Sequence, residues 1–110
     1  MLRANEQSIK NFLGIIKKSG KLSTGMDKVK ESIEKGECKL LIYARDTGIN
    51  TFDKAKTLTK NSSIELIEWG DKKTLGETLG TKPVAIVAIK DKKFAEKLCD
   101  LFFKNNRDDN

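Results

Sequence analysis

The fold of this chain is decided by one apolar stretch near its middle, Cys38-Lys39-Leu40-Leu41-Ile42-Tyr43-Ala44. A strand with one face in water alternates apolar and polar residues, whereas a strand covered on both faces is apolar almost throughout. The stretch is of the second kind. We therefore predict a central strand over residues 38–44, buried on both of its faces.

Helical and strand patterns alternate on both sides of this stretch. We predict helices over about residues 6–19, 26–35, 50–61, 72–79 and 92–103, and further strands over residues 21–24, 64–67 and 84–89. Chains that alternate in this way build layered folds. The predicted fold class is α/β, a three-layer α/β/α sandwich with a mixed sheet of about four strands.

Polar residues just before helical patterns predict N-caps. These are Asn5, the capping-box pair Asn50 and Asp53, and the single residues Asp71 and Asp91. Glycines in the fourth helix have different expected roles. We predict that Gly76 serves helix packing and that Gly80 ends the helix.

The chain has 110 residues, close to the commonest size of one domain. We predict one domain over residues 1–103 and a disordered polar tail over residues 104–110. The longest apolar run, residues 84–89, is far shorter than the roughly 20 residues of a membrane span. Residues 1–6 also lack the apolar core of a secretory signal, so we expect a cytoplasmic protein with no membrane partner.

The composition argues against an enzyme. The chain contains no histidine, which removes the commonest general base and zinc ligand. The two cysteines, Cys38 and Cys99, are predicted to be reduced, packed thiols, and we expect no catalytic residues, metal site or cofactor. Asp46 follows the central strand and is predicted to be a cap or turn residue, and the isolated Tyr43 and Trp69 are predicted to pack in the interior.

The positive charge is unevenly distributed. The formal net charge is +6, and residues 1–30 hold seven basic residues against two acidic ones. Residues 31–110 hold fifteen against fourteen and are almost neutral. Such a concentration is typical of a surface that faces a polyanion.

Residues 21–30 contain the most informative local pattern, a strand that passes through Gly25 into a helix. Backbone N–H groups, the helix dipole and the side chains of Lys28 and Lys30 meet there, an arrangement that suits a phosphate backbone. Gly25 lets that backbone approach without a Cβ in the way. We therefore expect replacement of Gly25 to reduce binding far more than stability.

The order of these elements resembles that of a known family over about residues 9–103. The resemblance rests on Gly25, on residues 39–46, on Leu75-Gly76, on residues 84–89 and on residues 94–98. By these features the chain is similar to the small bacterial YlxQ-like proteins, relatives of the L-seven-Ae and L-thirty-e ribosomal proteins that bind kink-turn RNA. The family's fold is the sandwich predicted above.

The resemblance also implies a binding site. In the family, RNA binds where the glycine-opened second helix meets two loops, one after the central strand and one before the last strand. The implied RNA-binding residues of this chain are Lys21, Thr24, Gly25, Met26, Asp27, Lys28, Lys30, Phe52, Lys72, Lys82 and Pro83. The ribosomal members carry Asn-Glu at the positions of Asp27 and Lys28, where their side chains read the sheared G·A pairs of the kink.

The sequence thus predicts a monomeric, non-enzymatic protein whose partner is structured RNA with a kink-turn, in ribosomal or other non-coding RNA, with the ribosome as a further candidate partner. Two alternatives remain open. One is a translation-associated protein-binding module without RNA affinity, and the other is a flavodoxin-like phosphoacceptor domain centred on Asp46.

Overall fold

The computed structural model describes residues 2–107, which form five helices and four strands in alternating order. The elements are α1 (Leu2–Lys18), β1 (Leu22–Thr24), α2 (Met26–Glu34), β2 (Leu40–Tyr43), α3 (Ile49–Thr59), β3 (Glu65–Glu68), α4 (Lys72–Leu79), β4 (Ile86–Ile89) and α5 (Lys92–Arg107).

The four strands form one mixed sheet in the order β1-β4-β2-β3. β4 runs antiparallel to both of its neighbours, and β2 and β3 run parallel to each other. The predicted mixed sheet is confirmed. β2 and β4 occupy the inner positions, which explains why their sequences are the most continuously apolar in the chain.

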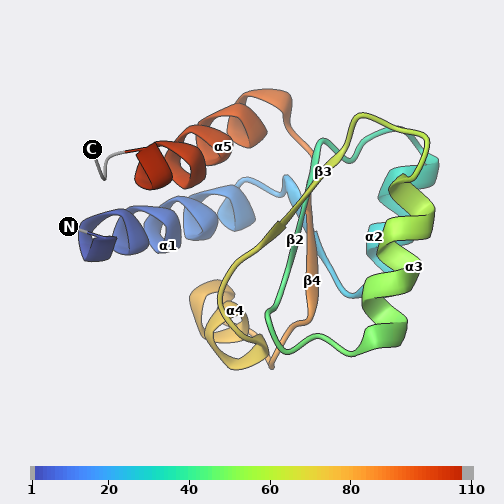
Figure 1. The fold of residues 1–110 in the computed structure, drawn as a ribbon, viewed down its shortest axis with the longest axis horizontal. Coiled ribbons are helices and arrows are strands. Elements are labelled where there is room, and N and C mark those ends of the chain that lie inside the picture. Colours follow the sequence, from blue (N-terminus) through green and yellow to red (C-terminus); the bar gives the residue numbers. More distant parts are fainter. Residues whose placement is uncertain (1, 108–110) are drawn as a thin grey trace.

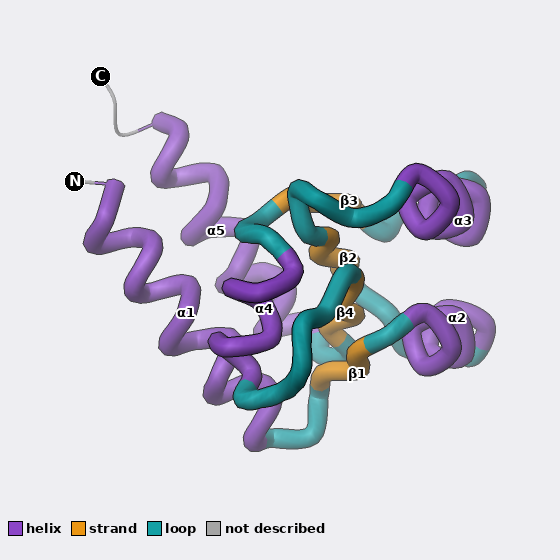
Figure 2. Tube along the Cα trace, turned by 90° about the horizontal axis from the view of Figure 1, so that it is seen from below, coloured by secondary structure: helices purple, strands orange, loops and turns teal. Residues whose placement is uncertain are grey.

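Helices cover both faces of the sheet, which confirms the three predicted layers. Figure 1 shows α1, α4 and α5 on one side and α2 and α3 on the other, and Figure 2 shows the sheet between them end-on. Successive side chains of a strand point to opposite faces. Leu40 and Ile42 of β2 accordingly join the core beneath α1, α4 and α5, whereas Leu41 joins the core beneath α2 and α3.

Two of the predicted N-caps are confirmed. The Asp71 carboxylate accepts a hydrogen bond from the Thr74 backbone N–H at 2.7 Å at the start of α4, and the Asp91 carboxylate accepts one from the Phe94 N–H at 2.9 Å at the start of α5. The predicted end of α4 is also confirmed, because Gly80 adopts the left-handed conformation with φ 70°.

Two predicted N-caps are wrong. α1 begins at Leu2, so Asn5 lies inside the helix. α3 begins at Ile49 and has Gly48 at its N-cap position, with no side-chain cap, so the capping box of Asn50 and Asp53 does not form. In both cases a good capping residue stands one or more positions inside the helix, because residue type alone does not fix where a helix begins.

The C-terminal part of the chain differs from its prediction. α5 continues through Arg107, so residues 104–107 of the predicted disordered tail are helical. The rest of the predicted tail, residues 108–110, lies outside the described residues.

Both cysteines are free, as predicted. Cys38 is buried and Cys99 is half-buried, and burial is the main cause that raises the pKa of each thiol. A raised pKa keeps a thiol protonated and weakly reactive. None of the helices within residues 2–107 is long and apolar enough to cross a membrane.

The predicted packing role of Gly76 is confirmed by its close approach to the loop that precedes β4. A Cβ added at Gly76 would lie 2.8 Å from the Lys82 carbonyl carbon and 2.9 Å from the Pro83 Cα. Both of those atoms are backbone and cannot move away as a side chain could. Gly76 therefore holds the loop of residues 81–85 directly against α4.

We expect Gly76→Ala to lower the free energy of unfolding by about 1–3 kcal/mol, because the added methyl group overpacks a backbone contact. The matched control is Gly14→Ala in α1, where a Cβ would meet nothing within 4 Å. That variant should be unchanged or up to about 1 kcal/mol more stable, since alanine favours helix. Urea denaturation measures both, and equal stabilities for the two variants would contradict this account.

Candidate functional site

Four chain segments meet at one edge of the sheet, where β1, β2 and β3 end and β4 begins. We call it the Gly25 edge; it is the lower edge in Figure 1 and faces the viewer in Figure 2. The Gly25 N–H donates to the Ile86 carbonyl at 3.1 Å, and the Ala44 N–H donates to the Ala85 carbonyl at 2.9 Å. Backbone hydrogen bonds thus join the start of α2 and the end of β2 to the same short segment.

The loop before β4 is also tied to α4 on the other face of the sheet. The Val84 N–H donates to the Lys72 carbonyl at 3.1 Å. Lys82 and Pro83 stay exposed at the loop's tip. The loop therefore presents these two residues from a fixed backbone.

The N-terminus of α2 opens onto this edge. The first backbone N–H groups of a helix have no acceptor within the helix. Gly25 occupies the N-cap position and has no side chain to supply one, and Asp27 and Lys28 in the first turn are exposed. The positive end of the helix dipole is therefore available to an anion at the Gly25 edge.

The conformation of Gly25 corrects one expectation. Its φ is 88° and its ψ is 150°, a region that is essentially restricted to glycine. A Cβ at Gly25 would meet nothing within 4 Å, so glycine is required there by the backbone conformation and not by a lack of room for a side chain. Replacing Gly25 must therefore cost stability, contrary to the expectation from the sequence.

The structure brings most of the predicted site residues to the Gly25 edge. They are Thr24, Gly25, Met26, Asp27, Lys72, Lys82 and Pro83. Met26 is half-buried and packs against the core beneath α2 and α3, so much of its side chain serves packing. Lys72 is half-buried at the first position of α4.

Three predicted residues lie apart from this group. Lys21 precedes β1 and lies at the opposite edge of the sheet, where its carbonyl accepts from the Lys90 N–H at 2.8 Å. Lys30 is in the second turn of α2, with its ammonium 4.0 Å from the Glu34 carboxylate. Phe52 is in the first turn of α3 and is engaged in packing: its ring centroid lies 5.0 Å from that of Tyr43, the last residue of β2.

Lys28 points along a groove between α2 and the outer edge of β1. This groove, about 160 Å³ in volume, is also lined by Ser23, Glu31, Lys35 and Lys90. The sequence analysis did not single out Lys35 or Lys90. Lys35 could have been found from its spacing, two helical turns after Lys28, but Lys90 joins the groove only through the register of β4 with β1.

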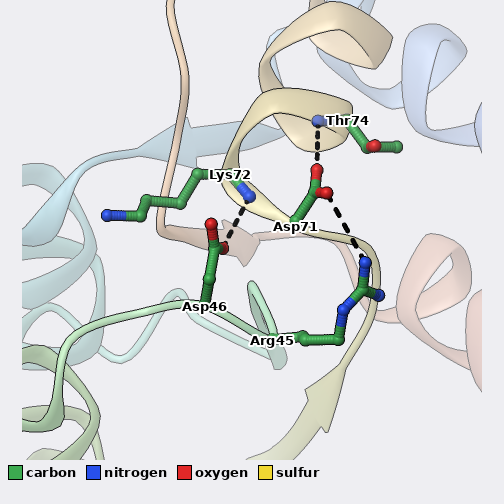
Figure 3. A network of polar contacts seen from close by, with 5 residues as sticks. All are labelled: Arg45, Asp46, Asp71, Lys72 and Thr74. Atoms are coloured by element: carbon green, nitrogen blue, oxygen red, sulfur yellow. Dashed lines mark hydrogen bonds and ion pairs between the residues drawn. The ribbon is translucent and has the colours of Figure 1, made fainter.

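A polar network ties the loop after β2 to the start of α4 (Figure 3). The Asp46 carboxylate accepts a hydrogen bond from the Lys72 backbone N–H at 2.8 Å, and Asp71 accepts from the Thr74 N–H. The Arg45 guanidinium lies 3.5 Å from the Asp71 carboxylate. The hydrogen bonds from Thr74, assisted by the Arg45 charge, hold the pKa of Asp71 below its ordinary value of 3.8.

The network explains Asp46 as a structural residue, as predicted. Its carboxylate caps α4 from a separate loop, so it is committed to a backbone N–H group. No cluster of three or more acidic, cysteine or histidine side chains within the described part of the chain could hold a metal ion around it. The geometry at Asp46 therefore favours a cap over a phosphoacceptor.

The two aromatic residues predicted to pack do so. Trp69 is buried, and its indole N–H donates to the Glu6 carboxylate at 3.0 Å. Tyr43 is half-buried against Phe52, and burial raises the pKa of its hydroxyl.

Comparisons with known proteins agree with this architecture. The sequence pattern of the ribosomal protein L7Ae/L30e/S12e/Gadd45 family matches residues 7–99. The RNA-binding protein YlxQ of Enterococcus faecium is 28% identical over 101 residues, covering 92% of this chain and 97% of that protein. The RNA-binding protein YlxQ of Bacillus subtilis is 27% identical over 90 residues, covering 82% and 90%.

Solved structures share the fold. A Bacillus halodurans protein of unknown function superposes with a TM-score of 0.80 at 27% identity, covering 84% of this chain and 94% of that one. The Giardia lamblia 15.5kD RNA binding protein superposes with a TM-score of 0.76 at 14% identity, covering 94% and 89%. At that identity the second likeness concerns the fold alone.

The Asp71 cap predicts a pH dependence of stability. Because the native pKa of Asp71 lies below its ordinary 3.8, the ionised carboxylate stabilises the fold at pH values above 3.8. This contribution is lost as the pH falls through the native pKa. Asp71→Asn keeps a capping side chain without the charge, so its stability deficit relative to the wild type should shrink as the pH drops from about 6 to about 3.

Urea denaturation across that pH range measures the deficit. The matched control is Asp53→Asn, which changes an exposed aspartate of α3 to the same amide. A deficit for Asp71→Asn that stays constant with pH, or that equals that of Asp53→Asn throughout, would contradict the charged cap.

Proposed function

This chain belongs to the ribosomal protein L7Ae/L30e/S12e/Gadd45 family, and we propose that it binds structured RNA with a kink-turn through the Gly25 edge. Both YlxQ relatives carry RNA binding in their names and match over most of their length. The carrying observation is the hydrogen bond from the Gly25 N–H to the Ile86 carbonyl. It sets the open N-terminus of α2 beside the loop that carries Lys82.

Phosphates account for part of the proposed recognition. The first-turn N–H groups of α2 and the ammonium groups of Lys72 and Lys82 supply donors and positive charge at the Gly25 edge, and Lys28 adds its charge from the adjoining groove between α2 and β1. Such contacts set the orientation of the RNA without reading its bases. These contacts also favour an RNA whose backbone bends sharply enough to reach both α2 and the loop before β4.

Base recognition falls to Asp27 in this proposal. Its carboxylate is exposed in the first turn of α2, where it can accept hydrogen bonds from guanine N–H groups of a sheared G·A pair. Gly25 keeps the approach to this turn free of a side chain. The expected RNA is ribosomal or another non-coding RNA with a purine-rich internal loop.

A titration against a kink-turn RNA, and against the same RNA with its G·A pairs replaced by Watson–Crick pairs, tests the proposal. With about three to five phosphate contacts, the slope of log affinity against log salt concentration should be about −2 to −4. The intact kink should bind more tightly. Equal affinities for the two RNAs would reject kink recognition, and no affinity for either would favour a protein-binding module.

Two substitutions separate shape from base recognition. Lys82→Ala should weaken binding to both RNAs about equally, because a phosphate contact carries no base information. Asp27→Ala should mainly remove the preference for the G·A-containing kink, by about 1–3 kcal/mol, the range of bidentate base contacts in DNA complexes.

Lys54→Ala, which removes an exposed lysine of α3, controls for the change in net charge. Competition binding with the two RNAs gives the discrimination of each variant. If Asp27→Ala discriminated as well as the wild type, the base contact would have to come from another residue.

A further inference from the structure

The strand register places three lysines side by side at the edge opposite the Gly25 edge. Leu22 of β1 and Leu40 of β2 both pair with Ile89 of β4, so the residues just beyond these pairs, Lys21, Lys39 and Lys90, lie on three adjacent strand ends. Two backbone hydrogen bonds hold the three residues there: the Lys90 N–H donates to the Lys21 carbonyl, and the Lys39 N–H donates to the Ile89 carbonyl, both at 2.8 Å. We call these three residues the lysine row.

The positive charge of the lysine row is not neutralised locally. Within residues 2–107, none of the three ammonium groups lies within 4.0 Å of a carboxylate, and that of Lys39 donates to the Gly36 carbonyl at 3.3 Å. Adjacent strands lie about 4.8 Å apart. The three lysine side chains therefore start from neighbouring backbone positions and concentrate positive charge at this end of the sheet, which favours a bound anion.

Two of the carboxylates near the row have other partners, and a third, Glu37, lies beside it. Asp91 caps α5 through the Phe94 N–H, and Glu31 pairs with Lys35 at 2.9 Å. Glu37 contributes the one carboxylate of the depression, about 270 Å³ in volume, that Lys21 and Lys90 line. The local balance of charge is thus positive.

A groove connects this row to the Gly25 edge. The depression lined by Lys21 and Lys90 shares Lys90 and Glu37 with the groove that Lys28 and Lys35 line between α2 and β1. β1 pairs only with β4, so this groove follows an edge of the sheet that no other described strand covers. The hydrogen bond and charge of Lys35, with the charges of Lys28 and Lys90, lower the pKa of Glu31, a sign of the positive field along the groove.

We propose that the phosphate backbone of an RNA stem leaving the Gly25 edge follows the α2–β1 groove and is bound by the lysine row. The inference rests on the proposed function for the identity of the ligand. It gives a binding role to Lys21, which was predicted as an RNA-binding residue together with Gly25 but stands at the other end of β1. β1 spans three residues, or about 10 Å, so only a stem that continues past the kink reaches the row.

The chemistry of the groove favours an RNA backbone over an acidic protein. The groove is lined by lysines, glutamates, serines and a glycine and contains no aromatic or aliphatic side chain. The centre of a protein interface is usually apolar and rich in aromatic residues. A polar, basic, open groove instead suits phosphates, and it would bind them without regard to sequence.

Three RNAs and two triple variants test the inference. The first RNA is a minimal kink-turn, and in each of the other two RNAs a different one of its stems is lengthened by about one helical turn. Lys21→Ala/Lys39→Ala/Lys90→Ala removes the row, and Lys10→Ala/Lys54→Ala/Lys97→Ala removes three exposed lysines from α1, α3 and α5 with the same change in net charge.

The wild type should bind one of the two lengthened RNAs more tightly than the minimal RNA. For that RNA, the slope of log affinity against log salt concentration should be steeper by about 2 to 3. The variant without the row should lose this gain and bind the minimal RNA like the control variant. The control should keep the gain. The inference is overturned if neither stem gives the wild type a gain, or if both triple variants respond alike.

Failure of the kink-turn proposal gives a different result. If the wild type does not prefer the kink, plain duplex RNA of the same length still tests the row by the difference in salt slope between the two triple variants. Polyglutamate tests the other kind of partner. Should removal of the row abolish polyglutamate binding and leave the stem-dependent gain intact, the row serves an acidic protein and the inference is wrong.

Discussion

The direction of β4 is the constraint on which the rest of this structure depends. β4 is antiparallel to β1 and β2, and through β2 it is opposed to β3 as well. At the Gly25 edge, the first residues of β4 therefore lie beside the last residues of β1 and β2, and β3 ends there too. At the opposite edge, the last residues of β4 lie beside the first residues of β1 and β2. The Gly25 edge brings together Gly25, Lys72 and Lys82, and the opposite edge brings together Lys21, Lys39 and Lys90.

The order and type of the elements could be predicted because they depend on local patterns. Residues 38–44 are apolar on both faces, and the helices carry apolar residues at helical spacing. Both patterns can be recognised without knowing which distant residues pack against them. Helix starts were less predictable. Asn5 and Asn50 are good caps by residue type, but the helices begin before them, at Leu2 and Ile49.

In the candidate site, too, some features could be predicted from local sequence patterns and others could not. Gly25 was recognisable as a site residue because it lies between a strand and a helix, but its φ of 88° shows a backbone requirement that was not predicted. Lys21 was grouped with it because the two are close in sequence, yet the whole length of β1 separates them. The direction of the Phe52 ring and the approach of Lys90 to the groove depend on tertiary packing and strand register, which no local pattern contains.

The place of β4 in the sequence has a consequence for biosynthesis. β1 has β4 as its only strand neighbour among the described residues, and Leu22 pairs with Ile89, near the other end of the chain. A chain emerging from a ribosome exposes its N-terminal part first. Until β4 emerges, β1 has no strand to pair with and β2 has one open side, so the sheet closes only after residue 89 has been made. A nascent chain arrested before residue 86 would leave unpaired the side of β1 and the side of β2 that β4 covers in the folded protein, and both would be exposed to chaperones or to other nascent chains.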